Sequence, residues 1–205
     1  MATIAHTSTL HLVSMDGETI GDAEMFNGLW TVEQYFRLTD QSNRHFEFTD
    51  GSIEVLPIPT RRHHVISRFL LRLLLAFLEP RGGTAFYSPL RVRVREGKFR
   101  EPDLIVVLDE DDPRLQDTYF LGAYLVVEIV SPDNPERDII VKRADYAEGL
   151  IPEYWIVNPI DEIVTVLRLE REEYAEHGVF QRGDAAISYL LEELAAWVSA
   201  IFDAR

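Results

Sequence analysis

Glu101-Pro-Asp-Leu-Ile-Val-Val107 is one of two short, almost wholly apolar runs in this chain, and the other is Ala123-Tyr-Leu-Val-Val-Glu-Ile-Val-Ser-Pro132. Each run predicts a buried β-strand. Each also carries one carboxylate, Asp103 at the entrance of the first and Glu128 near the end of the second. Burying an acid is unfavourable unless its charge is offset, so both positions need a physical explanation.

Two explanations are open for these acids. If the two strands lie side by side, Asp103 and Glu128 can share a divalent cation such as magnesium, which usually takes one or two carboxylates together with water and substrate phosphate. Alternatively, Asp103 caps a turn after Pro102, and Glu128 forms an ordinary ion pair. The 25-residue separation is long enough for a loop and a return into the same sheet.

The composition is that of a globular domain. With 205 residues, of which 46% are hydrophobic and 27% charged, the chain is long enough to bury a substantial core. The absence of cysteine excludes disulfides and thiolate metal sites and favours a reducing cytoplasm. The longest apolar run, residues 69–78, is too short to span a bilayer and includes Arg72, and we see no signal peptide, so we expect no membrane partner.

Charge is distributed unevenly along the chain. The formal net charge is −15, which ordinarily disfavours a nucleic-acid partner because lysine and arginine supply most nonspecific affinity. Residues 61–100 nevertheless carry a net charge of +8, and the remainder carries −23. An acidic protein therefore contains one basic segment.

The first half of the chain has clear element signals after residue 28. Residues 1–28 predict an irregular arm, poorly ordered or used in an oligomer contact, and we divide the chain into an arm of residues 1–30 and a single domain of residues 31–205. Thr31-Val-Glu-Gln34 has the form of a capping box before a short helix. Residues 44–55 predict a hairpin around Asp50-Gly51, and apolar spacings of three and four predict a long amphipathic helix over residues 60–79.

The second half predicts several strands and two helices. We expect strands at residues 85–87 and 90–94, with the run from residue 101 as the strand adjacent to the latter, and a surface loop at residues 109–112. Asn134 and Pro135 predict the start of a helix that ends near Gly149. Strands are expected at residues 153–157 and 163–169, an edge strand at residues 171–180, and a closing helix at residues 189–202.

Three further residues are candidates for chemistry. Lys142 is suited to orienting a water beside a metal-bound phosphate, although Asp138 lies four residues before it and predicts an ordinary surface ion pair. Glu47 is either a third ligand or a base acting through water, or an acid on the solvated face of its strand. His63 opens the long helix and can reach a phosphate or a water, but no third histidine completes a zinc site.

Arginines make up most of the basic segment. Arg91, Arg93 and Arg95 share one strand face by period two, and Arg61, Arg62, Arg68 and Arg72 crowd the start of the long helix. Three interpretations are open: a phosphate-contacting surface, a solvated face that balances the acidic remainder, or an oligomer interface for the strand. The chain has no GxSxG elbow, phosphate loop, dinucleotide fingerprint or HExxH motif.

The order of these pieces resembles the Uma family of restriction endonucleases, a branch of the PD-(D/E)XK nuclease superfamily. The segments that carry the resemblance are Phe46-Glu-Phe-Thr-Asp-Gly51, His63, Glu101-Pro-Asp103, Val127-Glu-Ile-Val-Ser-Pro132, Glu136-Arg-Asp138, Lys142-Arg-Ala-Asp-Tyr146 and Ile151-Pro-Glu-Tyr-Trp-Ile-Val157. The resemblance implies an α/β, restriction-endonuclease-like core with a mixed sheet flanked by helices, an N-terminal hairpin and a long amphipathic helix.

The resemblance also implies a set of site residues. Asp103 and Glu128 match the metal-binding acids, and the main-chain carbonyl of Ile129 completes the site. The superfamily lysine stands two residues after the second acid, where this chain has Val130, and Lys142 looks like its migrated replacement. Glu47 matches an additional acid of the hairpin, and His63 matches the residue that opens the long helix.

The implied activity is hydrolysis of DNA phosphodiester bonds by a cytoplasmic, homodimeric endonuclease that uses Mg²⁺ or Mn²⁺. The resemblance assigns DNA contacts to the basic segment, and we place them at Arg62, His63, Arg91, Arg93 and Arg95. The competing hypothesis is a catalytically silent, nuclease-like scaffold that binds nucleic acid or a protein partner. It draws on the net charge of −15 and on Val130.

Overall fold

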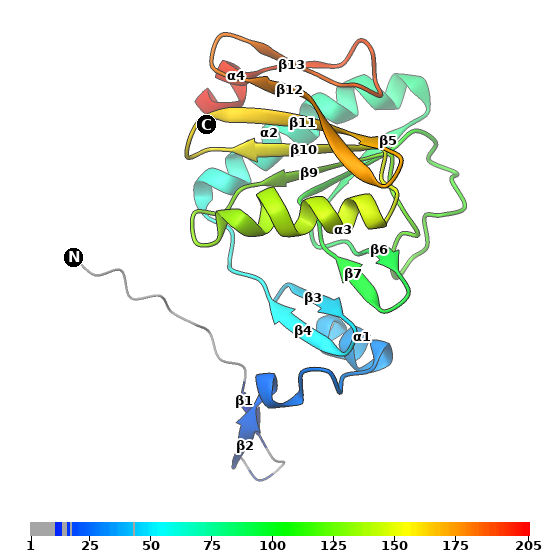
Figure 1. Ribbon diagram of the computed structural model, residues 1–205, viewed down its shortest axis with the longest axis vertical. Helices are drawn as coiled ribbons and strands as arrows, with labels where there is room; N and C mark the ends of the chain where they lie inside the picture. Colours follow the sequence, from blue (N-terminus) through cyan, green and yellow to red (C-terminus); the bar gives the residue numbers. More distant parts are fainter. Residues whose placement is uncertain (1–10, 14–15, 17, 43) are drawn as a thin grey trace, which may run out of the picture. The chain divides into compact units, whose positions relative to one another are not determined.

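Figure 1 shows a computed structural model of the protein, in which residues 11–13, 16, 18–42 and 44–205 are described. The chain divides into two compact units, and each is described by itself. The smaller unit comprises residues 1–58 and 97–99, and the larger comprises residues 59–96 and 100–205. The proposed division into an arm of residues 1–30 and one domain from residue 31 stays a prediction.

The beginning of the smaller unit contains more regular structure than the sequence predicted. Strands β1 (His11–Val13) and β2 (Thr19–Asp22) pair in antiparallel fashion, and a 3-10 helix follows at Ala23–Phe26. The expectation of an irregular stretch is therefore wrong for these residues, because such short elements show no sustained period. For residues 1–10, 14, 15 and 17, the same expectation concerns positions outside the described residues.

The rest of the smaller unit confirms the sequence signals. Helix α1 (Val32–Asp40) begins with the predicted capping box, in which Gln34 N donates to Thr31 Oγ1 at 3.2 Å and Thr31 N donates to Gln34 Oε1 at 2.8 Å. Strands β3 (Phe46–Thr49) and β4 (Ser52–Val55) form the hairpin. Its turn residues Asp50 and Gly51 both have positive φ, 46° and 83°, as a tight hairpin turn requires.

The larger unit is built on a six-stranded mixed sheet with the order β12-β11-β10-β9-β8-β5. Its strands are β5 (Thr84–Tyr87), β8 (Leu104–Val107), β9 (Leu125–Ile129), β10 (Glu153–Asn158), β11 (Ile163–Glu170) and β12 (Glu173–Phe180). Within this sheet, β9 and β10 pair in parallel, and the other neighbouring strands pair in antiparallel fashion. The mixed sheet and the edge strand β12 confirm those predictions.

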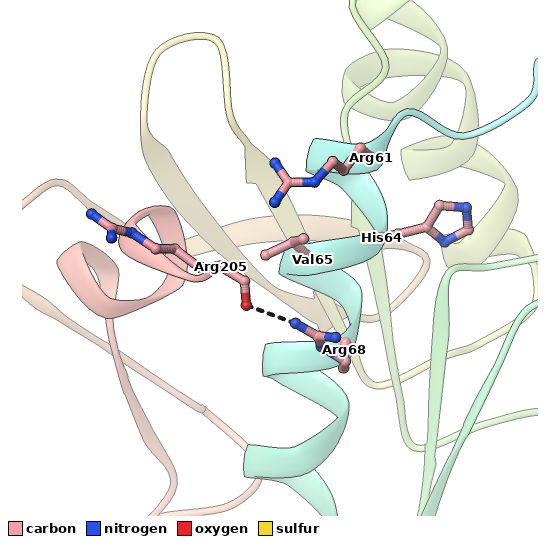
Figure 2. Close-up of a pocket in the computed structure, with 5 residues that line it drawn as sticks. All are labelled: Arg61, His64, Val65, Arg68 and Arg205. Carbon is pink, nitrogen blue, oxygen red and sulfur yellow. Dashed lines mark hydrogen bonds between the residues drawn. The ribbon is translucent and has the colours of Figure 1, made fainter.

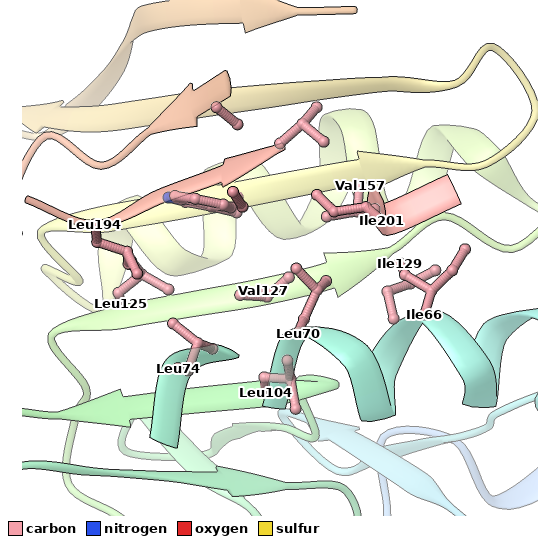
Figure 3. Close-up of a cluster of buried hydrophobic side chains, with 14 of the residues drawn as sticks. Ile66, Leu70, Leu74, Leu104, Leu125, Val127, Ile129, Val157, Leu194 and Ile201 are labelled. Atoms are coloured by element: carbon pink, nitrogen blue, oxygen red, sulfur yellow. The ribbon is translucent and has the colours of Figure 1, made fainter. Parts of the chain in front are cut away.

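The two faces of this sheet bury different side chains against different helices. Helix α2 (Arg61–Leu78) covers one face, where Leu70 packs in a cluster with Leu104, Val106 and Val127 (Figure 3). Helix α3 (Lys142–Glu148) covers the other face (Figure 1), where Tyr146 joins a second cluster. Because side chains alternate along a strand, even-numbered residues of β8 face α2, whereas even-numbered residues of β9 face α3.

One predicted strand pairing is wrong. The run that begins at Glu101 was expected to lie beside the strand at residues 90–94, which is β6 (Val92–Arg95). Instead, the chain after the turn at Gly97 forms the short strand β7 (Lys98–Arg100), and β8 pairs with β5 and β9. The apolar run of β8 is buried on both faces, which a central position in the larger sheet provides.

The predicted closing helix at residues 189–202 is mostly not helical. A hairpin of β13 (Ala185–Ile187) and β14 (Ala195–Trp197) occupies this region, and only α4 (Val198–Asp203) is helical. The buried carboxylate of Glu153 accepts hydrogen bonds from Ser188 Oγ at 2.9 Å and Leu190 N at 2.6 Å. These long-range bonds hold the start of the expected helix in a turn.

Candidate acid and lysine site

The pairing of β8 with β9 brings the two acid-bearing segments together. The strands are antiparallel, with Leu104 opposite Val127, so the register places Asp103 opposite Glu128 at the next step. By the alternation of side chains along each strand, both positions belong to the sheet face that α3 covers. The two runs therefore lie side by side in one sheet, which is the condition that the shared-cation explanation requires.

Lys142 reaches Glu128 because α3 crosses the sheet between the parallel strands β9 and β10. Its ammonium lies 2.8 Å from Glu128 Oε1 and 3.3 Å from Asp138 Oδ1. All three side chains are buried, with exposed fractions of 4% for Lys142, 2% for Glu128 and 5% for Asp138. The predicted pair of Asp138 and Lys142 therefore exists, but it is buried rather than on the surface, and it includes Glu128.

A π-helical turn directly precedes Lys142. The helical segment begins at Pro135, as the sequence predicted, and passes through the π turn Arg137–Val141 before α3. The wider turn shifts the helical register, and both Asp138 and Lys142 are buried on the side that faces the sheet. Gly149 ends the helix, which confirms the predicted C-cap.

Sequence reasoning assigned no role to two tyrosines that support these acids. Tyr146 donates its hydroxyl to Glu128 Oε1, the same oxygen that Lys142 contacts. Tyr154 donates to the main-chain carbonyl of Asp138 at 2.7 Å, and burial together with the charges of Glu128 and Asp138 raises its pKa, so it remains a donor. The spacing of four from Asp138 to Lys142 to Tyr146 was a usable signal for Tyr146.

The carboxylates outnumber the cations in this cluster. Burial raises the pKa of Asp138 above its usual value, Lys142 opposes that rise, and the negative charge of Asp103 adds to it. Asp103 and Asp138 are therefore close enough to interact electrostatically. The cluster holds a surplus of negative charge that an additional cation would relieve.

Asp103 is held by two groups. Its Oδ2 accepts a hydrogen bond from Ile129 N at 2.7 Å and lies 3.0 Å from His63 Nε2. His63 is placed by the start of α2, where Thr60 Oγ1 accepts a hydrogen bond from His63 N at 3.2 Å. The structure therefore brings Asp103, Glu128, Lys142 and His63 into one region, and the role of the Ile129 carbonyl stays a prediction.

Glu47 lies on β3 of the smaller unit. Its side chain is only 1% exposed, and its cross-strand partner is the exposed Glu54. The interpretation of Glu47 as an acid on a solvated strand face is therefore wrong. Its assignment as an additional site acid stays a prediction.

The arginines predicted to contact nucleic acid have partners within the protein. Val92 and Val94 are buried between them, as the alternation predicted. Arg95 pairs with Glu148 at 2.7 Å, Arg91 lies 4.0 Å from Glu101, and Arg93 lies over the ring of Tyr119. Arg62 donates to the carbonyl of Phe202. Their contacts with DNA stay predictions.

Two negative findings apply to the described part of the chain. Among its residues, no group of three or more His, Asp or Glu side chains is arranged to hold a metal ion. Within the same residues, no helix has the length and apolar character needed to cross a membrane.

The larger unit has a mixed sheet with one helical layer on each face. Its strand-helix-strand crossover carries buried acids and a lysine. Together these features define a nuclease-like α/β fold. A crystal structure from Anabaena variabilis, described as a putative nuclease belonging to DUF820, superposes with a TM-score of 0.69 over 84% of this chain and 97% of that chain, at 20% identity. The chain belongs to the Uma2 family, described as "Putative restriction endonuclease", whose model matches residues 32–199. No curated protein matches the chain.

The resemblance to the Uma family is thus confirmed, and so is the restriction-endonuclease-like core. The hairpin β3–β4 and the long helix α2, which were expected with that core, are both present. Because the identity to the Anabaena variabilis protein is only 20%, this similarity supports the fold and no shared activity.

The buried ammonium of Lys142 gives a stability prediction. Lys142→Met leaves the carboxylates of Glu128 and Asp138 without their cation, so urea denaturation should show a loss of about 3 kcal/mol in unfolding free energy. In a double-mutant cycle, Asp138→Asn should recover part of that loss, because one of the two uncompensated charges is removed. Additive effects of the two substitutions would contradict the described ion pair.

Proposed function

We propose that this protein is a DNA endonuclease that hydrolyses phosphodiester bonds with the help of magnesium or manganese. The observation that carries the proposal is the contact of Lys142 with Glu128. Glu128 lies on β9, which pairs with β8, and Asp103 directly precedes β8. Membership of the Uma2 family supports the nuclease class. DNA as the substrate, the metal dependence, a homodimer and a cytoplasmic location are all parts of this proposal.

The residues present fit a hard divalent cation. Asp103 and Glu128 supply the carboxylate oxygens that magnesium prefers, and two acids suffice where water and a substrate phosphate complete the octahedron. Burial is the main cause of the raised pKa of Asp138, and the negative charge of Asp103 adds to it, so the two carboxylates lie close enough for one cation to act on both. When bound, the metal would supply Lewis-acid polarisation of the phosphoryl oxygen and a lowered pKa for water.

The other side chains have roles that follow from their contacts. Lys142 holds its ammonium beside Glu128 and can orient an attacking water or stabilise negative charge on the phosphate. Tyr146 fixes Glu128 through the same oxygen, so the acid keeps its orientation. His63 lies on Asp103 Oδ2 and can donate to a substrate phosphate or to the leaving oxygen.

A catalytically silent scaffold is the second candidate. Lys142 is engaged by two buried carboxylates, and Val130, which stands where the superfamily has its lysine, is buried at 1% exposure. A lysine held in this way can serve the fold alone, since buried ion pairs also occur without any catalytic role. The two candidates differ in metal binding and in turnover.

Site substitutions should separate the proposal from the scaffold. Asp103→Ala and Lys142→Ala should each abolish magnesium-dependent or manganese-dependent cleavage of plasmid DNA, because each removes a group to which the proposal gives a role at the reacting phosphate. Asp117→Ala removes an exposed acid from a loop and serves as the matched control, with cleavage unchanged. Cleavage that survives both site substitutions would refute the assignment.

Tyrosine substitutions should test metal binding in an experiment that does not depend on DNA cleavage. Tyr146→Phe should weaken manganese binding by about tenfold in calorimetry, because Glu128 loses a hydrogen bond that orients it. Tyr174→Phe is the matched control, since it removes a buried hydroxyl that donates to the Ile151 carbonyl at 2.7 Å. Equal effects of the two changes would show a general packing role, and no binding to the native protein at millimolar metal would favour the scaffold.

A further inference from the structure

A pocket of about 700 Å³ lies beside the first half of α2 in the larger unit. It is lined by Arg61, His64, Val65, Arg68 and Arg205. Figure 2 shows Arg61 and Val65 projecting from α2 toward the segment that carries Arg205. The lining therefore contains three guanidinium groups and an imidazole, and no acidic side chain.

Two cations of this pocket, Arg61 and Arg68, have no ion pair with a described acid, whereas Asp203 interacts electrostatically with the third, Arg205. Arg61 has no hydrogen bond or ion pair with any described residue, and Arg68 donates to the main-chain carbonyl of Arg205 at 2.6 Å. The acids that interact with Arg62 are Glu162 and Asp203, and both are paired with Arg182, which lowers the pKa of each carboxyl. The positive charges of Arg61 and Arg68 are therefore available to a ligand.

This concentration of cations is unusual for the chain. The net charge is −15, yet the first turn of α2 contains no acid. Like charges that gather in one place repel each other and cost stability, and local departures of this kind are expected at functional sites. An anionic ligand is the partner that this charge pattern fits.

The pocket adjoins the acid and lysine site along one helix. His64 lines the pocket, its ring centroid lies 6.2 Å from that of His63, and His63 Nε2 contacts Asp103. Arg61 and His63 are two residues apart in the first turn of α2, so one extended anion that crosses the start of the helix could reach both. A nucleic-acid strand provides such a series of phosphates, whereas a single small anion would not connect the two places.

We propose that this pocket is a subsite for a backbone phosphate of the same DNA strand whose reacting phosphate the proposed metal site at Asp103 and Glu128 would bind. The inference rests on the proposed function for its choice of ligand. Arg61 and Arg68 supply the positive charge, and a volume of about 700 Å³ admits the phosphate together with its sugar.

Binding of a short fluorescein-labelled DNA duplex, measured by anisotropy in EDTA so that no cleavage occurs, tests the subsite. Arg61→Ala and Arg68→Ala should each weaken binding by about tenfold at about 0.1 M salt and lower the slope of log K against log salt by about 0.9, the value for one lost phosphate contact. Arg72→Ala removes an exposed cation one turn further along α2, outside the pocket, and should leave binding unchanged.

Three outcomes would overturn the subsite: no DNA binding by the native protein, no effect of the pocket variants, or an equal effect of Arg72→Ala, which would indicate general charge attraction. Thermal unfolding of each variant verifies that α2 remains packed, and Arg61→Lys should retain most of the affinity. Cleavage assays keep the two proposals distinguishable. DNA binding that depends on the pocket residues, without any cleavage, would refute only the endonuclease proposal. Cleavage with an unchanged KM in Arg61→Ala would refute only the subsite proposal.

Discussion

The buried ammonium of Lys142 between Glu128 and Asp138 is the interaction on which the rest of the site depends. Removing three charged groups from water costs several kcal/mol for each ion, and only close mutual contact offsets that cost. The contact requires Glu128 to point toward α3 and requires α3 to cross the sheet directly above it. The parallel pairing of β9 with β10 supplies both conditions, because a crossover helix must then join the two strands.

The same crossover explains how fold and chemistry are connected. β9 contributes Glu128 on one face and, through the Ile129 amide, a hydrogen bond to Asp103. The start of α2 contributes His63 to Asp103 from the other helical layer. Glu128 on β9, Asp103 just before β8, and the side chains of Lys142 and His63 from two helices are therefore linked through these contacts. Both strands lie inside the sheet.

The sequence predicted the parts of this site that have local signals. Apolar runs located the strands of Asp103 and Glu128, and the family pattern singled out Lys142, whose spacing from Asp138 alone indicated a surface pair. Tyr146 was missed because its partner Glu128 is remote in sequence. The prediction of a closing helix was wrong for a similar reason, since the hydrogen bonds from Ser188 and Leu190 to the remote Glu153 override the local helical pattern.

The central claim is that Asp103 and Glu128 form a cation site beside Lys142. A crystal structure of the protein grown with manganese tests this claim most directly through anomalous scattering. The account predicts a manganese peak bound by the carboxylates of Asp103 and Glu128, with the Lys142 ammonium nearby. A structure in which manganese binds elsewhere, or nowhere, while Lys142 remains on Glu128 would contradict it.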